Sequence, residues 1–199
     1  MSKDWTGNSR SAFAQMGARN YAHEERERHD YYATEPKATR LLLERERFTP
    51  LVWEPACGEG HMAKVLEEYG YRVYASDLID RGYGDVLDFL ACSAPPLSEM
   101  ADIVTNPPYK YAKEFAEHAL DLLPDGGRCA MFLKLQFLEG KARRKMFEKY
   151  PPRTVYVSSS RLHCAKNGDF AAYQNKNCIA YAWFVWEKGF TGDPVIRWI

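Results

Sequence analysis

Asn106, Pro107, Pro108 and Tyr109 carry the most specific chemical signal in the sequence, and they directly follow the apolar run at 102–105. Proline lacks a backbone N–H and has a fixed φ, so the two prolines stiffen the segment and leave carbonyl groups free to accept hydrogen bonds. The Asn106 side-chain oxygen and the Pro107 carbonyl can both accept from one exocyclic NH₂ group, which points the nitrogen lone pair at a methyl donor. Tyr109 can stack on a planar ring. A plain turn would explain the prolines but not the paired acceptors.

A second group of residues lies upstream and is suited to a cationic ligand. Gly58 and Gly60 follow the apolar run at 51–53, and a glycine turn between a strand and a helix gives a ligand close access to the backbone. Many α/β proteins have such a turn, but Glu54 beside it would repel a pyrophosphate and attract an amine. Asp77 lies 23 residues after Glu54, where an acidic side chain commonly accepts from both hydroxyls of a ribose.

The order of these motifs resembles the class I S-adenosylmethionine-dependent amino-methyltransferases with an N-P-P-Y motif, especially the N6-adenine DNA methyltransferases. The resemblance covers roughly residues 31–186 and implies S-adenosyl-L-methionine as the cofactor. It places the methionine amino group at Glu54, the ribose at Asp77 and the cofactor adenine at Asp88, with Asp85 as an alternative to Asp88. It implies that the catalytic residues are Asn106, Pro107, Pro108 and Tyr109, and that the cofactor-binding residues are Tyr32, Thr34, Pro36, Glu54, Pro55, Ala56, Gly58, Gly60, Asp77, Leu78, Asp88, Phe89 and Asn106.

The same resemblance implies a nucleic-acid substrate, DNA in the first place, whose target adenine must leave the base stack to be methylated. Tyr109 and an aromatic residue of the late loop, Phe170 or Tyr173, would then contact the base. Three alternatives remain open: adenine in RNA, a glutamine amide of a protein, and a cofactor-binding subunit without activity. A nicotinamide dehydrogenase is disfavoured, because it would leave the N-P-P-Y motif without a role.

The pattern of strands and helices predicts the fold that positions these residues. Strand and helix patterns alternate, which is typical of a mostly parallel sheet covered on both faces. We therefore expect an α/β fold: a Rossmann-like seven-stranded methyltransferase sheet, mostly parallel, with an antiparallel last strand. Strands are predicted at about 51–53, 71–75, 102–105, 128–135, 154–158 and 178–186, and helices at about 34–47, 61–69, 111–123 and 139–150.

Composition and length limit the classes of protein to consider. The 199 residues are 46% hydrophobic, which is enough for one domain with a real core, and the 27 basic residues balance the 27 acidic ones. The five cysteines lack zinc-ligand spacing, and no apolar run could span a bilayer. We expect a cytoplasmic protein without metal or membrane contacts, with a polar arm at 1–30 and one catalytic domain at 31–199.

A basic segment remains without an assigned role: Lys141, Arg143, Arg144 and Lys145 lie in the predicted helix at 139–150. Such a charge run is by default a solvated face, and contact with phosphates is the alternative. Family members that read a sequence usually carry a separate recognition domain, and no segment after the last predicted strand is long enough for one. We therefore expect a short or degenerate target, or recognition through a partner subunit or a homodimer.

Overall fold

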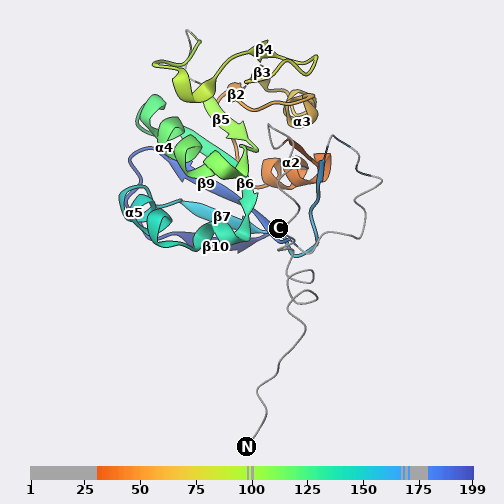
Figure 1. Ribbon diagram of the computed structural model, residues 1–199. Helices are drawn as coiled ribbons and strands as arrows, with labels where there is room; N and C mark the ends of the chain where they lie inside the picture. Colours follow the sequence, from red (N-terminus) through yellow and green to blue (C-terminus); the bar gives the residue numbers. More distant parts are fainter. Residues whose placement is uncertain (1–30, 98, 100, 167, 169, 171–178) are drawn as a thin grey trace, which may run out of the picture.

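The computed structural model describes residues 31–199 except positions 98, 100, 167, 169 and 171–178, so the predicted arm at 1–30 and Tyr173 lie outside the described residues. The described helices lie on both sides of one large sheet (Figure 1). The strands are β1 (Tyr32–Thr34), β2 (Leu51–Glu54), β3 (Arg72–Asp77), β4 (Asp85–Val86), β5 (Asp102–Thr105), β6 (Arg128–Lys134), β7 (Thr154–Val157), β8 (Cys164–Lys166), β9 (Tyr181–Glu187) and β10 (Val195–Trp198). The helices are α2 (Pro36–Leu43), α3 (His61–Glu68), α4 (Ala112–Leu122) and α5 (Lys141–Lys149), with the 3₁₀ helices η1 (Phe89–Ala91), η2 (Tyr109–Tyr111) and η3 (Leu135–Leu138).

The main sheet has the strand order β10-β7-β9-β6-β5-β2-β3-β4. Its neighbouring strands are parallel except for β9, which is antiparallel to both β6 and β7. The predicted α/β class is confirmed, with two differences of detail. The sheet has eight strands rather than seven, and the antiparallel strand is the last but one. Two strands of the sheet, β4 and β10, lie outside the six predicted ranges. β10 pairs with β7 and is exposed along its whole length, and its four residues show no alternation of apolar and polar side chains that would have predicted it.

The hydrophobic core consists of two layers, one on each face of the sheet. Successive side chains of a strand point to opposite faces. Trp53 and Ile103 therefore pack in the layer that contains α4 and α5, whereas Val52 and Val104 pack in the layer that contains α2 and α3. The central strands β2, β5, β6 and β9 are covered on both faces, which explains their nearly continuous apolar sequences.

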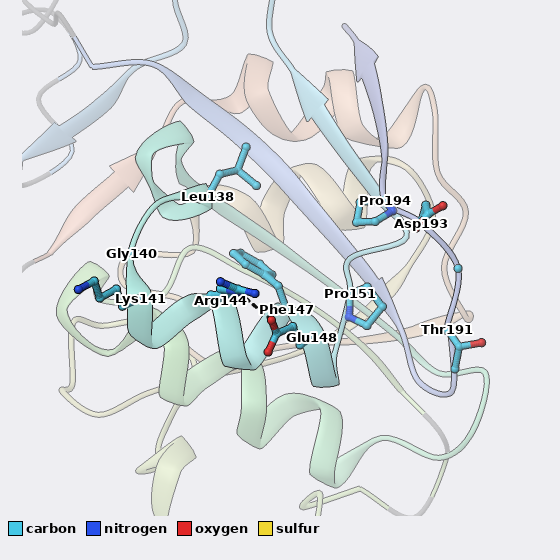
Figure 2. Close-up of a pocket in the computed structure, with 11 residues that line it drawn as sticks. Leu138, Gly140, Lys141, Arg144, Phe147, Glu148, Pro151, Thr191, Asp193 and Pro194 are labelled. Carbon is cyan, nitrogen blue, oxygen red and sulfur yellow. Dashed lines mark hydrogen bonds and ion pairs between the residues drawn. The ribbon is translucent and has the colours of Figure 1, made fainter.

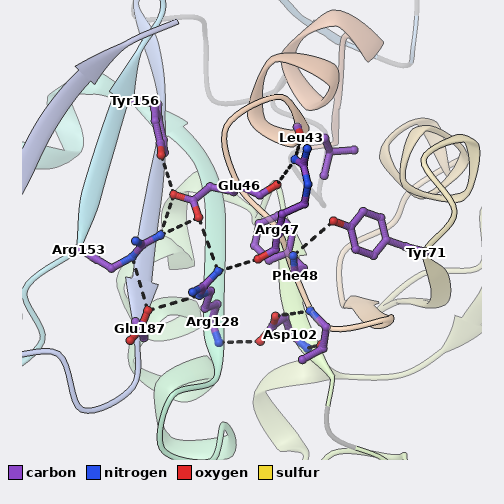
Figure 3. A network of polar contacts seen from close by, with 11 residues as sticks. Leu43, Glu46, Arg47, Phe48, Tyr71, Asp102, Arg128, Arg153, Tyr156 and Glu187 are labelled. Carbon is purple, nitrogen blue, oxygen red and sulfur yellow. Dashed lines mark hydrogen bonds and ion pairs between the residues drawn. The ribbon is translucent and has the colours of Figure 1, made fainter.

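Buried polar contacts join the amino ends of the parallel strands. Asp102, the first residue of β5, accepts hydrogen bonds from the backbone N–H groups of Thr49 and Arg128, both at 2.7 Å. Glu46 follows α2 and accepts from the Arg153 guanidinium at 2.6 Å and 2.7 Å (Figure 3). Asp102 thus connects the start of β5 with the residue before β2 and with the start of β6, and Glu46 connects the segment after α2 with the residue before β7.

Two further contacts complete this network. The Tyr156 hydroxyl donates to Glu46 at 2.6 Å, and Glu187 at the end of β9 forms ion pairs with Arg128 and Arg153 at 3.3 Å and 3.6 Å (Figure 3). Glu46 is only 5% exposed, so its partners compensate a carboxylate that has little contact with water. The network lies at the edge of the sheet opposite to the carboxyl ends of the parallel strands.

We expect Glu46→Ala to lower the free energy of unfolding by about 2–3 kcal/mol, because Arg153 and Tyr156 lose a charged partner that is largely shielded from water. Urea unfolding followed by circular dichroism measures this loss. Glu68→Ala is the matched control: it removes an exposed ion pair with Arg40, which contributes about 1 kcal/mol or less. Equal shifts of the two unfolding midpoints would show that the buried network does not stabilise the fold.

Candidate functional site

Four neighbouring parallel strands, in the order β3-β2-β5-β6, bring the predicted site residues to one edge of the sheet. Asp77 is the last residue of β3, Glu54 is the last residue of β2, Asn106 follows β5 directly, and Lys134 ends β6. In open α/β sheets, ligands bind outside the carboxyl ends of the strands. The structure therefore brings together Asp77, Glu54 and Asn106 at the edge where a ligand is expected, although they are far apart in the sequence.

Glycine shapes the turn between β2 and α3. Gly58 and Gly60 have φ angles of 54° and 78°, which side chains of L-residues disfavour. The Gly58 N–H donates to the Asp77 carboxylate at 2.8 Å, and this bond ties the turn to the end of β3. A Cβ added to Gly58 would lie 2.1 Å from the Tyr31 ring, and one added to Gly60 would lie 2.5 Å from the Tyr83 ring. Two tyrosine rings thus cover the turn and leave no room for side chains on it.

Glu54 is a buried carboxyl group, only 2% exposed, and its Oε2 has no hydrogen-bond partner among the described residues. Burial raises the pKa of Glu54 well above its usual range; a hydrogen bond from the backbone of Ala63 opposes this effect, and the negative charge of Asp77 adds to it. A buried, unpartnered acceptor is costly unless a ligand satisfies it. Glu54 is therefore well suited to bind a cationic group that enters the site.

Asn106 is held in one orientation. Its Nδ2 donates to the backbone carbonyl of Tyr32 at 2.8 Å, and its Oδ1 is buried without a hydrogen-bond partner among the described residues. The neighbouring threonine hydroxyls of Thr34 and Thr105 are also buried and lack a partner within that part of the chain. The amide therefore retains one unsatisfied acceptor, Oδ1, which is buried in the structure; its role toward a substrate amine stays a prediction.

Tyr109 lies in a cluster of aromatic side chains rather than on an open surface. Its ring centroid is 6.3 Å from that of Tyr32 and 6.0 Å from that of Tyr181, and the Lys134 Nζ lies 4.8 Å from it. The Tyr109 hydroxyl is 3.2 Å from the Cys164 Sγ. Burial of the hydroxyl raises the pKa of Tyr109 well above its usual range, so the phenol stays protonated. Stacking of Tyr109 on a base remains a prediction, because parts of its ring already have neighbours.

Three of these neighbours are not among the site residues predicted from the sequence: Cys164, Tyr181 and Lys134. Cys164 reaches the site because β8 pairs antiparallel with β1 in a separate two-stranded ribbon, with Thr34 opposite Cys164. A three-residue strand has too few positions to show a pattern. Lys134 could have been found, because a charged residue at the end of an apolar strand is the signal that identified Glu54.

The residues predicted to bind the cofactor adenine differ in how exposed they are. Leu78 is 57% exposed beside Asp77, whereas Phe89 is 2% exposed and packs in the core against Trp53 and Phe115, with ring centroids 5.1 Å and 4.8 Å away. In η1 the Phe89 ring points toward the core, and its predicted contact with the cofactor stays a prediction. The Leu90 N–H donates to the Asp88 carboxylate at 3.0 Å. Burial, and next to it the Asp85 carboxylate, raise the pKa of Tyr74. The choice between Asp85 and Asp88 stays open.

The remaining predicted residues surround the same edge. Phe170 follows β8, and its ring centroid lies 5.4 Å from that of His61 at the start of α3, so it contacts the region of the glycine turn. Its role beside a base, like that of Tyr173, remains a prediction. Thr34 lies in β1, and Pro36 is the first residue of α2. Pro55 and Ala56 lie in the turn after β2, and Pro107 and Pro108 follow Asn106 directly.

A groove of about 730 Å³ lies elsewhere, between α5 and the loop before β10 (Figure 2). Arg144 and Glu148 of α5 line one side of it, and Asp193 lies on the other side. None of the residues at the carboxyl edge lines this groove. Within the described part of the chain, no group of His, Cys, Asp and Glu residues could hold a metal ion, and no helix is long and apolar enough to cross a membrane.

No protein-family model and no curated protein matches this sequence. Solved structures match its fold. The methyltransferase subunit of a type I restriction-modification system from Streptococcus thermophilus matches with a TM-score of 0.59 and 16% identity over 83% of this chain and 48% of that chain. A protein described as a candidate class I S-adenosylmethionine-dependent methyltransferase from Listeria monocytogenes matches with a TM-score of 0.53 and 14% identity, over 81% of this chain and 62% of that one.

TrmN from Thermus thermophilus is a third match, with a TM-score of 0.51 and 22% identity over 77% of this chain and 48% of that chain. The chain spans about half the length of the type I modification subunits that it matches. At these identities the likeness concerns the fold. The protein has the Rossmann-like fold of the class I S-adenosylmethionine-dependent methyltransferases.

Proposed function

We propose that this protein transfers a methyl group from S-adenosyl-L-methionine to an exocyclic amino nitrogen, namely N6 of adenine in DNA. The orientation of Asn106 carries this proposal. Because its Nδ2 is bound to the Tyr32 carbonyl, its buried Oδ1 is the atom that meets a substrate. An NH₂ group is a complementary donor for such an acceptor, and it carries a second N–H for the Pro107 carbonyl, whereas a hydroxyl has only one hydrogen and a carbonyl oxygen has none.

The residues at the ends of β2 and β3 fit the proposed cofactor. The buried, unpartnered Oε2 of Glu54 suits a cationic amino group. The Asp77 carboxylate accepts from the Gly58 and Ile79 N–H groups, and it keeps further lone pairs for ribose hydroxyls, since a carboxylate can accept about four hydrogen bonds. Exposed Leu78 offers an apolar surface for a ring. When bound, the cofactor supplies a methyl group on a sulfonium, which is a good leaving group.

The chain's own residues contribute positioning rather than a strong base. In our proposal, Asn106 Oδ1 and the Pro107 carbonyl accept from the two N–H bonds of the amine and direct its lone pair toward the donor. Positioning of this kind converts an encounter in solution into a reaction within one complex and supplies much of the rate gain. The amine proton can leave after transfer, so no general base is assigned. Tyr109 would stack on the target ring.

DNA is the proposed substrate because the match with a type I restriction-modification methyltransferase subunit points in that direction. The chain spans about half of that subunit, and we propose that sequence recognition comes from a partner subunit or a second copy of the chain. A cytoplasmic location suits its four described cysteines, which are all free. RNA adenine, a protein glutamine amide, and cofactor binding without activity are the outcomes that the following experiment separates from DNA methylation.

Transfer of labelled methyl groups from S-adenosyl-L-methionine to DNA, RNA and cell protein, measured in parallel and followed by nucleoside analysis, tests the proposed function. We expect the label in DNA, and after digestion the labelled nucleoside should elute as N6-methyl-2′-deoxyadenosine. Label in N6-methyladenosine from RNA, or in protein methylglutamine, would replace the proposed substrate. Absence of transfer to all three, together with measurable cofactor binding, would identify a binding subunit without activity.

Asn106→Ala should reduce methyl transfer at least about 100-fold, in line with the loss of an oriented acceptor in a preorganised site. Cofactor affinity, measured by calorimetry, should fall much less than methyl transfer, because the main role proposed for Asn106 is to orient the acceptor nitrogen. Cys164→Ala is the matched control: it removes a neighbour of the same amide, 3.9 Å away, but retains Oδ1. Near-normal turnover of Asn106→Ala would exclude the proposed mechanism.

Cofactor affinity should depend on pH through Glu54. The raised pKa keeps the Glu54 carboxyl protonated below that pKa when the site is empty, whereas a bound amino cation favours the ionised form. Binding should therefore release up to about one proton below the raised pKa, and affinity should fall as the pH is lowered. Calorimetry in two buffers of different ionisation enthalpy measures this release. Glu54→Gln should abolish it, and unchanged proton release in that variant would assign the effect to another group.

A further inference from the structure

Charge is distributed unevenly along the carboxyl edge of the sheet. The ends of β3 and β2 carry the acidic residues Asp77 and Glu54, and β4 begins with Asp85 beside them. On the other side of Asn106, β6 ends with the basic residue Lys134, and Lys110 lies in η2 directly after the N-P-P-Y motif. Among these residues the charge therefore changes from acidic to basic at the proposed acceptor-binding residue, although the chain as a whole has no net charge. Glu35 is the acidic residue on the basic side: burial raises the pKa of Cys164, and next to burial Glu35 and Lys134 have opposite effects on that pKa.

Both lysines lie over aromatic rings. The Lys134 Nζ is 4.8 Å from the Tyr109 ring centroid, and the Lys110 Nζ is 5.0 Å from that of Tyr111. No carboxylate of the described residues forms an ion pair with either ammonium group. Tyr111 is 44% exposed, so its ring is accessible to a ligand. Cations next to an exposed aromatic ring are the combination that binds the backbone and bases of an unpaired strand.

The basic helix α5 is less suited to this role. The Arg143 guanidinium donates to the backbone carbonyl of Gln136 at 3.2 Å, and Arg144 forms an ion pair with Glu148 at 2.8 Å. Glu148 and Asp193 also line the groove beside α5, where they would repel phosphates (Figure 2). The basic run that is most evident in the sequence is thus partly neutralised by neighbours, whereas Lys110 and Lys134 adjoin the N-P-P-Y motif.

We propose that Lys110, Tyr111 and Lys134 form a binding surface for an unpaired nucleic-acid strand, in which the two lysines contact phosphates and Tyr111 stacks on a base next to the target. This inference rests on the proposed function and refines it: it places the substrate on the basic half of the edge and the cationic cofactor on the acidic half. It also favours a nucleic-acid substrate over a protein glutamine amide, because a protein substrate has no phosphates for the two lysines to bind.

The salt dependence of binding tests this surface. The probe is a short fluorescent single-stranded DNA that contains adenine, titrated with the full chain in the presence of S-adenosylhomocysteine. Each lost phosphate contact should reduce the slope of log affinity against log salt by about 0.7, so the double variant Lys110→Gln and Lys134→Gln should lose about 1.4. Tyr111→Leu should weaken binding about tenfold or more at every salt concentration, whereas Tyr111→Phe retains the stacking ring and should bind normally.

The exposed lysines of α5 provide the matched control. Lys141→Gln and Lys145→Gln remove the same charge from the basic helix and should leave the slope unchanged. Thermal unfolding and cofactor calorimetry, unaltered in all variants, would show that the fold and the cofactor site are intact. A slope that falls in the α5 variants but not in the Lys110 and Lys134 variants would overturn this surface and leave the proposed methylation of DNA standing. Absence of salt-dependent binding to DNA and RNA by the unmodified chain would overturn both.

Discussion

Parallel pairing of β3, β2, β5 and β6 is the constraint on which the candidate site depends. Parallel strands all end at the same edge of a sheet, so the residues that follow them must converge there whatever their separation in the chain. Because β2 lies between β3 and β5, Glu54 is placed between Asp77 and Asn106. The crossover helices α3 and α4 keep these strands parallel and cover the two faces of the sheet. The chemistry of the edge therefore follows from the order of the strands.

The two edges of the sheet differ in how their polar groups are satisfied. At the amino edge, Asp102 and Glu46 have several hydrogen-bond partners each, and these bonds hold the starts of the strands together. At the carboxyl edge, Glu54 and Asn106 each retain a buried oxygen without a partner among the described residues. A buried polar atom without a partner costs about 1–3 kcal/mol. At the amino edge Arg153 Nε also lacks a hydrogen bond, so the difference between the edges concerns the oxygens of Glu54 and Asn106, which a ligand would satisfy in the proposed function.

The ribbon of β1 and β8 gives the site its orientation. The Tyr32 carbonyl in β1 accepts the hydrogen bond that fixes the Asn106 amide, and Cys164 in β8 contacts the Tyr109 hydroxyl. The segment before the glycine turn and the segment after β7 thus meet over the N-P-P-Y motif. The orientation of the Asn106 amide and the surroundings of Tyr109 therefore depend on two segments that are remote from the motif in sequence.

The sequence by itself determined the α/β class and the approximate bounds of most strands and helices, because apolar periodicity is a local property. It also predicted Glu54, Asp77 and Asn106 as site residues from their places after apolar runs, and the structure brings these three to one edge of the sheet. The sequence did not determine the extra edge strand β10, the burial of Phe89 or the neighbours of Tyr109. Only the tertiary structure decided these features. The pairing of short strands and the direction in which a side chain points depend on contacts between segments distant in the chain, and no local pattern encodes such contacts.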